Sequence, residues 1–379
     1  MNKMEYEDLA MLNNFDWYYK DLFIWKNKYY SKGKRIVFFG EKIENPKFTV
    51  VLKKFKIDKN YKQILKELYF LVCCQKSNYF IKLVDIFLSK DQDYIFLILK
   101  DEGANLLELI DYAANNQEGF DYTQMEDMIK WIIFQIICGL YILHKNKLIH
   151  HDIKPGNILI SSTGVVKIAD FGSVDKSCTR GNGTILYESP QVLLRHIGRH
   201  IGDEKDDMWA VGIIMVELYK KYFPFFNWEQ FSDQNNEEGK KILQLKSILS
   251  KYKININGKE IDINNNNDFD SISQKLTEKN FFEKNNFKEE LCNIEEINDK
   301  EAFDLINNLL KINPQKRFSA EEALNSNYLS KFKNEFKMSQ ISYILKDYDT
   351  LITNVKNKND FIKNVETIKQ KYLGEVLFE

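Results

Sequence analysis

The chain has 379 residues, of which 44% are hydrophobic and 29% charged, as is ordinary for a globular protein with a large buried core. Its 54 lysines and arginines balance 55 aspartates and glutamates, which argues against a nucleic-acid-binding protein and against a polybasic membrane protein. The apolar run at residues 131–143 is too short to span a bilayer and predicts a buried helix instead.

The cysteines and the N-terminus indicate the compartment. The five cysteines form no CxxC pair and have no histidine at metal-binding spacing, which argues against a zinc site and against a disulfide framework. The first ten residues contain acidic side chains and lack the apolar stretch of a secretory signal. We therefore expect an intracellular protein, in the cytoplasm, the nucleus or a cytoskeletal organelle.

The first part of the chain, after an N-terminal extension of residues 1–20, is predicted to be mostly β-strand. Short β-branched and aromatic runs at residues 35–40, 48–55 and 93–99 are typical of strands. A single helix is predicted over residues 61–72, where apolar side chains recur at helical spacing.

After Gly103 the pattern becomes helical. Residues 125–145 predict a long buried helix, and residues 204–221 predict a second one that is apolar nearly all round and therefore central to a core. Residues 227–300, rich in Asn, Lys and Glu, predict a surface insertion with short helices. The tail at residues 332–379 is predicted to form two amphipathic helices beyond the domain. A small β-rich lobe followed by a larger helical lobe is an α+β architecture.

Four polar side chains within nineteen positions have the chemistry that phosphoryl transfer needs. That reaction uses a carboxylate near the attacking hydroxyl, oxygen ligands for Mg²⁺, and fixed cations near the phosphates. The four residues are Asp152, Lys154, Asn157 and Asp170, and they lie in two loops flanked by apolar strands. We expect the two loops to bring them together.

The segments that carry these residues, LIHHDIKPGNILI and VVKIADFG, resemble the catalytic loop HRDxKxxN and the metal-binding DFG turn of the eukaryotic protein kinases. The resemblance implies that Asp152 is the catalytic base for the substrate hydroxyl and that Lys154 lies near the γ-phosphate. It further implies that Asn157 and Asp170 hold Mg²⁺. A lysine at position 154 is the pattern of the serine/threonine kinases.

Two upstream residues resemble the family's phosphate-binding ion pair. The strand VVLKKF resembles the VAIK strand, which makes Lys53 the lysine on the α- and β-phosphates of ATP, and Glu67 resembles its partner. Lys54, Lys56 and Lys66 lie close by in the sequence. The register matters, because strand alternation sends Lys53 and Lys54 to opposite faces.

Downstream, GTILYESPQVLL resembles the end of an activation segment, which makes Thr184 the threonine that contacts the catalytic aspartate and lysine. Asp207 matches the aspartate that holds the catalytic-loop backbone from below. Arg317 matches an arginine that normally pairs with a glutamate, but Gln191 stands at the glutamate position and can only hydrogen-bond. Four residues match the stacked apolar column that registers the lobes: Leu71, Leu83, His150 and Phe171.

The sequence departs from the family at the Gly-rich loop and in the catalytic loop. Residues 25–42 keep Gly33 but contain no GxGxxG, so we expect weakened or reshaped nucleotide binding. His151 replaces the arginine that usually pairs with a phosphorylated activation-loop residue, so phosphorylation there is not expected to be the main switch. Ser177 and Thr179 are the candidate phosphosites.

The expected hinge is also unusual, since Lys100 and Asp101 stand where the family often has Glu and an apolar residue. The gatekeeper position falls on Leu97 or Leu99. The residues that the resemblance assigns to the nucleotide and its metal are Lys53, Gly33, Leu99, Asp101, Asn157 and Asp170.

The resemblance implies a bilobal kinase domain over residues 21–331, with an N-lobe at about 21–102 and a C-lobe at about 103–331. The activation segment and the insertion site resemble the cyclin-dependent and related CMGC kinases and the replication-origin-firing kinases. We therefore expect a serine/threonine kinase that uses ATP and Mg²⁺, with a protein substrate and an activating subunit as partners and with no nucleic acid or membrane. The alternative is a pseudokinase acting as a nucleotide-binding or docking scaffold, which His151 and Gln191 favour.

Overall fold

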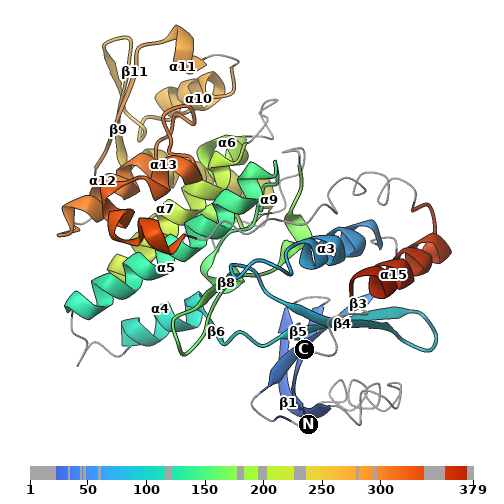
Figure 1. Cartoon of the computed structure of the whole chain (residues 1–379). Coiled ribbons are helices and arrows are strands. Elements are labelled where there is room, and N and C mark those ends of the chain that lie inside the picture. Colours follow the sequence, from blue (N-terminus) through green and yellow to red (C-terminus); the bar gives the residue numbers. More distant parts are fainter. Residues whose placement is uncertain are drawn as a thin grey trace. The chain divides into compact units, whose positions relative to one another are not determined.

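The computed structural model describes residues 23–32, 35–42, 45, 48–58, 61–115, 122–176, 183–194, 203–225, 236–278, 281–292, 297–336 and 355–373. The chain divides into a β-rich unit, formed by residues 1–103 and 339–379, and a helical unit, formed by residues 104–338 (Figure 1). The division follows Gly103, where the sequence pattern changes from strand to helix.

The β-rich unit is built on one five-stranded antiparallel sheet with the order β1-β2-β3-β5-β4. The strands are β1 (Phe23–Lys32), β2 (Arg35–Lys42), β3 (Thr49–Lys56), β4 (Leu83–Leu88) and β5 (Tyr94–Lys100). One face of the sheet carries a buried apolar cluster: Val50, Leu52, Phe96 and Ile98. Because side chains alternate along β3, Lys53 points to the other face.

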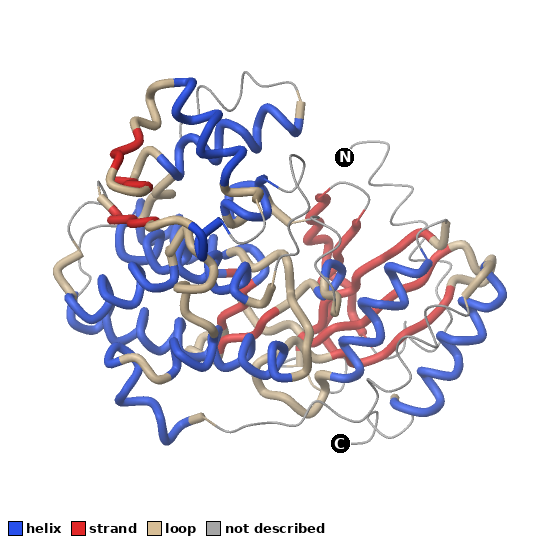
Figure 2. Tube along the Cα trace, turned by 90° about the horizontal axis from the view of Figure 1, so that it is seen from above, coloured by secondary structure: helices blue, strands red, loops and turns tan. Residues whose placement is uncertain are grey.

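Two helices of this unit lie beside the strands, α3 (Tyr61–Cys73) and α15 (Lys358–Tyr372) (Figure 2). The sequence predicts residues 332–379 as a tail beyond the domain, but the structure differs. Helix α15 packs on α3 inside the β-rich unit, because its apolar stripe is buried there. Phe332 belongs to the helical unit, where its ring centroid lies 5.2 Å from that of Trp131. Residues 337–354 and 374–379 of the predicted tail lie outside the described residues.

The core of the helical unit is made by α5 (Tyr122–Lys145) and α7 (Lys205–Lys220), and every residue of α7 from Asp206 to Leu218 is buried. Residues 125–145 are long and apolar enough to cross a membrane, yet 72% of the apolar window is buried within the protein, as in a core helix. The other elements around this core are α4 (Leu106–Asn115), α6 (Pro190–Leu193), α12 (Lys300–Leu309), α13 (Ala320–Leu324) and a 3-10 helix (Asn327–Glu335).

The predicted insertion contains a small sheet that the sequence analysis missed. Its elements are α9 (Glu237–Leu249), β9 (Tyr252–Ile256), β10 (Lys259–Ile261), α10 (Asn266–Lys275), α11 (Phe281–Lys284) and β11 (Phe287–Leu291). The strands pair in the order β10-β9-β11. In β9 the buried Tyr252, Ile254 and Ile256 alternate with Lys253 and Asn255, but each strand has at most five residues and the surrounding sequence is rich in Asn and Lys, so the alternation is too short to stand out.

Candidate functional site

A short sheet of the helical unit positions the two predicted metal ligands. Strand β7 (Ile158–Ile160) pairs antiparallel with β8 (Val166–Ile168), and β6 (Ala104–Asn105) lies on its other side. Asn157 directly precedes β7 and Asp170 closely follows β8, so both emerge at the same end of the hairpin. The Ala169 amide donates to the Asn157 carbonyl oxygen at 2.9 Å, which links the two turns.

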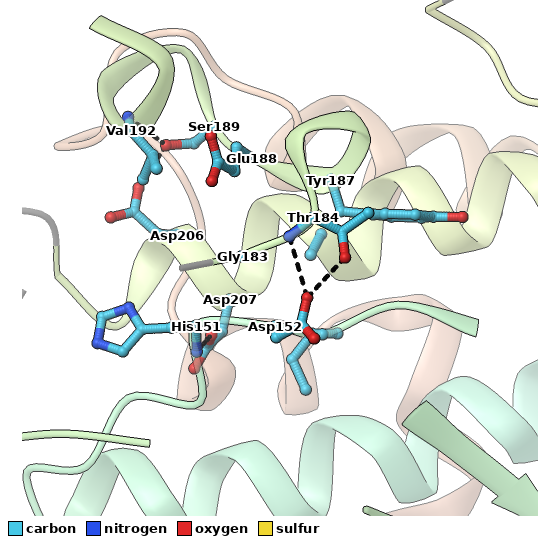
Figure 3. A pocket seen from close by; sticks show the side chains of 12 residues that line it. His151, Asp152, Gly183, Thr184, Tyr187, Glu188, Ser189, Val192, Asp206 and Asp207 are labelled. Atoms are coloured by element: carbon cyan, nitrogen blue, oxygen red, sulfur yellow. Dashed lines mark hydrogen bonds between the residues drawn. The ribbon is translucent and has the colours of Figure 1, made fainter. Parts of the chain in front are cut away.

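The carboxylate of Asp152 is the centre of the site. Its Oδ1 accepts hydrogen bonds from the Thr184 amide at 3.0 Å and the Thr184 hydroxyl at 2.8 Å (Figure 3). Its Oδ2 accepts from Lys154 Nζ at 2.6 Å and from Asn157 Nδ2 at 3.0 Å. Lys154 Nζ also donates to the Thr184 hydroxyl at 2.6 Å. The structure thus brings together four residues that the sequence singles out.

The same contacts orient Asn157 for a cation. Its Nδ2 donates to the Asp152 carbonyl at 2.7 Å as well as to the Asp152 carboxylate, so the Asn157 Oδ1 is turned the other way. An amide oxygen and the Asp170 carboxylate are hard ligands that fit Mg²⁺. Among the described residues no three His, Cys, Asp or Glu side chains gather as a metal centre. Two protein ligands completed by phosphate and water suit Mg²⁺.

A buried aspartate holds the catalytic-loop backbone, as the sequence predicts for Asp207. Its two oxygens accept from the His150 amide at 2.8 Å and the His151 amide at 2.9 Å. His144 Nε2 lies 2.9 Å from the same carboxylate. The two residues are 63 positions apart, and no sequence motif predicts this contact. Burial raises the pKa of Asp207, but the hydrogen bond and charge of His144 outweigh it, so the pKa lies below its ordinary value.

Two residues of the site have left-handed backbone, His151 with φ of 67° and Asp170 with φ of 64°. This conformation is uncommon for residues other than glycine and costs about 1–3 kcal/mol each. The hydrogen bond from the His151 amide to Asp207 helps to hold the first of these conformations. Strained backbone thus occurs in the same two loops as the candidate catalytic residues.

Gly183 allows the activation segment to approach the catalytic loop. A Cβ at this position would lie 2.6 Å from the His151 carbonyl oxygen, so the backbone would have to shift. We expect Gly183→Ala to displace the neighbouring Thr184 from Asp152 and to lower the rate of phosphate transfer by about 10²-fold, as misplacements near 1 Å do. Kinetics of the full chain would measure this, and an unchanged kcat would show that the segment is not positioned through Gly183.

Behind the segment lies a cavity of about 30 Å³, lined by residues of the catalytic loop, the activation segment and α7 (Figure 3). It has room for about one or two water molecules. It is therefore too small to enclose a nucleotide.

Arg317 joins three parts of the helical unit. The fully buried guanidinium donates to Gln191 Oε1 at 2.6 Å and to the Lys311 and Lys205 carbonyls at 3.0 and 3.2 Å. Gln191 Nε2 in turn donates to the Ile312 carbonyl at 2.5 Å. The predicted hydrogen bond between Gln191 and Arg317 is thus present, and Gln191 uses its amide nitrogen for a bond that a glutamate could not make.

The half-buried Tyr187 and the buried Glu217 form a pair that the sequence analysis missed. The Tyr187 hydroxyl donates to the two Glu217 oxygens at 3.0 and 3.1 Å. Burial raises the pKa of Glu217 to about 8, while the Tyr187 hydrogen bond lowers it and the charge of Asp111 raises it. Burial also raises the pKa of Tyr187.

The Glu217 pKa predicts a pH dependence of stability. The folded-state pKa lies above the unfolded value near 4.5, so this contribution to stability is present below about pH 4.5 and is lost as the pH rises through about 8. Between pH 5 and pH 8 we expect wild type to lose roughly 3 kcal/mol relative to Glu217→Gln. Urea unfolding of both proteins at three pH values measures this, and parallel curves would contradict it.

In the β-rich unit, Lys53 forms a buried ion pair with Glu67 of α3. Lys54 points to the opposite face, where its Nζ lies 4.3 Å from the ring centroid of Tyr94. Lys53 is therefore the lysine that reaches the helix, in the predicted register.

Two further residues predicted to bind the nucleotide, Leu99 and Asp101, lie at and directly after the end of strand β5. Leu99 is buried opposite Val51 in the sheet, and Leu97 is opposite Lys53. The Asp101 amide donates to the Thr49 carbonyl at 3.0 Å, and the Asp101 side chain accepts from the Gly103 amide at 3.1 Å. Of the other candidates, Gly33, Ser177 and Thr179 lie outside the described residues.

A β-rich unit with a Lys–Glu pair on its sheet, followed by a helical unit with this Asp–Lys–Asn–Thr cluster, defines a phosphotransferase of the protein-kinase type. Residues 42–329 match the protein kinase domain, so the chain belongs to that family. The predicted bilobal fold and the predicted family are confirmed.

Named relatives are serine/threonine-protein kinases. The chain is 32% identical to SSN3 of Candida albicans over 64% of its length and 40% of the relative's. It is 30% identical to SSN3 of Scheffersomyces stipitis over 77% of its length and 67% of the relative's. The MAP kinase LmaMPK10 from Leishmania major shares the fold with a TM-score of 0.65 and 18% identity, covering 97% of this chain and 98% of that one.

Proposed function

We propose that the chain is an active serine/threonine protein kinase, which transfers the γ-phosphate of Mg-ATP to hydroxyl groups of a protein substrate. The observation that carries the proposal is the Asp152 carboxylate, held by Thr184, Lys154 and Asn157. In phosphoryl transfer the protein mainly positions groups and stabilises charge, and the hydrogen bonds among these side chains support such a role.

The contacts support one role for each residue. Asp152 orients the attacking hydroxyl and accepts its proton, and Lys154, between Asp152 and Thr184, supplies a fixed positive charge. Asn157 and Asp170 would hold Mg²⁺, which neutralises charge on the phosphates. Lys53, fixed by Glu67, would hold the α- and β-phosphates.

The CMGC-like assignment, the activating subunit and the intracellular location belong to the same proposal. The insertion that follows α7 supports the assignment. Cys73, Cys74 and Cys138 are buried and none of the three is in a disulfide, which supports a reducing compartment.

The test is transfer of labelled γ-phosphate from Mg-ATP by the full chain to a generic basic protein, followed by phosphoamino acid analysis. We expect label on serine and threonine that disappears without Mg²⁺ and in Asp152→Asn. Equal background in wild type and variant, together with no thermal stabilisation by millimolar Mg-ATP, would favour the pseudokinase scaffold instead.

A further inference from the structure

Helix α3 is buried on more than one face. All seven residues from Glu67 to Cys73 are buried, although a helix packed on one surface keeps an exposed side. Within the same unit α15 packs on α3 (Figure 1), and the Tyr61 hydroxyl at the start of α3 donates to the Lys356 carbonyl at 3.4 Å. The C-terminal segment therefore covers part of the helix that carries Glu67.

The apolar side of α15 is well buried. Phe361 is fully buried, and Val365 and Ile368 are nearly so, at helical spacing along one face. The Phe361 ring centroid lies 6.3 Å from that of Tyr61, the first residue of α3. Lys363 and Glu366 are exposed on the other side of α15. An apolar stripe against α3 and a polar outer side are typical of a docked helix.

Polar contacts tie both ends of α15 to the sheet. At its start, Lys358 Nζ lies 2.7 Å from Asp93 Oδ1, next to strand β5. Near its end, Lys369 Nζ donates to the Ile86 carbonyl of β4 at 2.7 Å and lies 3.2 Å from the buried Asp85 carboxylate. Helix α15 thus connects the strands to α3, and it is anchored at two points along its length.

We propose that α15 is a built-in positioning element for the phosphate-binding pair: it docks on α3 and the sheet together and so keeps Glu67 on Lys53. A 13-residue helix is marginal without tertiary packing, so removing one of its packing partners should loosen it. The inference rests on the proposed function, since the Lys53–Glu67 pair serves catalysis only if the chain uses ATP. It also means that the face of α3 covered by α15 is not open to a partner protein while α15 is docked.

The first test removes the apolar contact in the full chain. In Phe361→Ala/Val365→Ala we expect faster amide hydrogen exchange over residues 61–73 and about a tenfold lower kcat, with KM for the protein substrate changed less than about threefold. Glu366→Ala, on the exposed side of α15, is the matched control and should leave both unchanged. In a Glu67→Gln background the two alanines should lower kcat no further, because they act through Glu67.

A second test does not depend on the core variant folding. Lys358→Asp and Asp93→Lys each place like charges together and should raise hydrogen exchange in both α15 and α3 about two- to threefold, and the double exchange should restore it.

Faster exchange in α15 with unchanged α3 would overturn the proposal, as would a kcat loss that persists undiminished in the Glu67→Gln background. If wild type transferred no phosphate, the proposed function would fail, whereas the exchange of α3 would still show whether α15 holds it.

Discussion

Asp152→Asn is expected to lower kcat for phosphate transfer by about 10³-fold, with a change of only about 1 kcal/mol in the free energy of unfolding. The asparagine has the same shape and can still accept from Thr184. The substitution removes the carboxylate that accepts the proton. The asparagine NH2 group would face Lys154 Nζ and Asn157 Nδ2, which are hydrogen-bond donors and need an acceptor there. The Lys53–Glu67 pair is untouched, so the KM for ATP should change little.

Steady-state kinetics with urea unfolding measures both parts of this prediction. Asp270→Asn, at an exposed position of α10, is the matched control for loss of one carboxylate and should behave as wild type. A folded Asp152→Asn protein with more than a tenth of the wild-type kcat would show that another group accepts the proton.

Arg317→Ala is expected to destabilise the chain by about 3–5 kcal/mol, the largest stability effect we expect from a single substitution. The side chain is fully buried, and its Nη1 lies 3.4 Å from Asp206 Oδ1, while the guanidinium lies 5.1 Å from the Trp209 ring centroid. Alanine would leave a cavity, an unpaired Gln191 oxygen, and a buried Asp206 carboxylate without its cation. Asp206 would keep only its bonds from neighbours such as the Ser189 hydroxyl at 2.5 Å.

Denaturant unfolding of Arg317→Ala and of Lys316→Ala compares two losses of one positive charge. The difference between their free energies of unfolding measures what the buried contacts of Arg317 contribute. Lys316 is the exposed neighbour, and its replacement should change the free energy of unfolding by less than about 0.5 kcal/mol. Equal effects of the two substitutions would mean that the buried contacts of Arg317 contribute nothing measurable to stability.

The sequence alone determined the order of the lobes, the strands and helices with strong periodicity, and the local motifs around Asp152 and Asp170. These features depend on neighbouring residues, and the side-chain periods of 2.0 and 3.6 residues can be read directly from the chain. The largely apolar α7 and the amphipathic α3 lie where the sequence predicts them, within a residue or two. The insertion's three strands were missed because each has only three to five residues, too few for an alternating pattern to stand out in an Asn- and Lys-rich segment.

Only the tertiary structure decided which distant side chains meet. The resemblance assigns Lys53, but only the structure shows that α3 covers the face of β3 that carries Lys53 and not the face that carries Lys54. The contacts of His144 with Asp207 and of Tyr187 with Glu217 join residues 63 and 30 positions apart without a local motif. The contact of α15's segment with α3 joins Tyr61 and Lys356, which are 295 positions apart. An amphipathic stripe shows that a helix buries one side, but the partner that covers that side is chosen by packing, which no local pattern records.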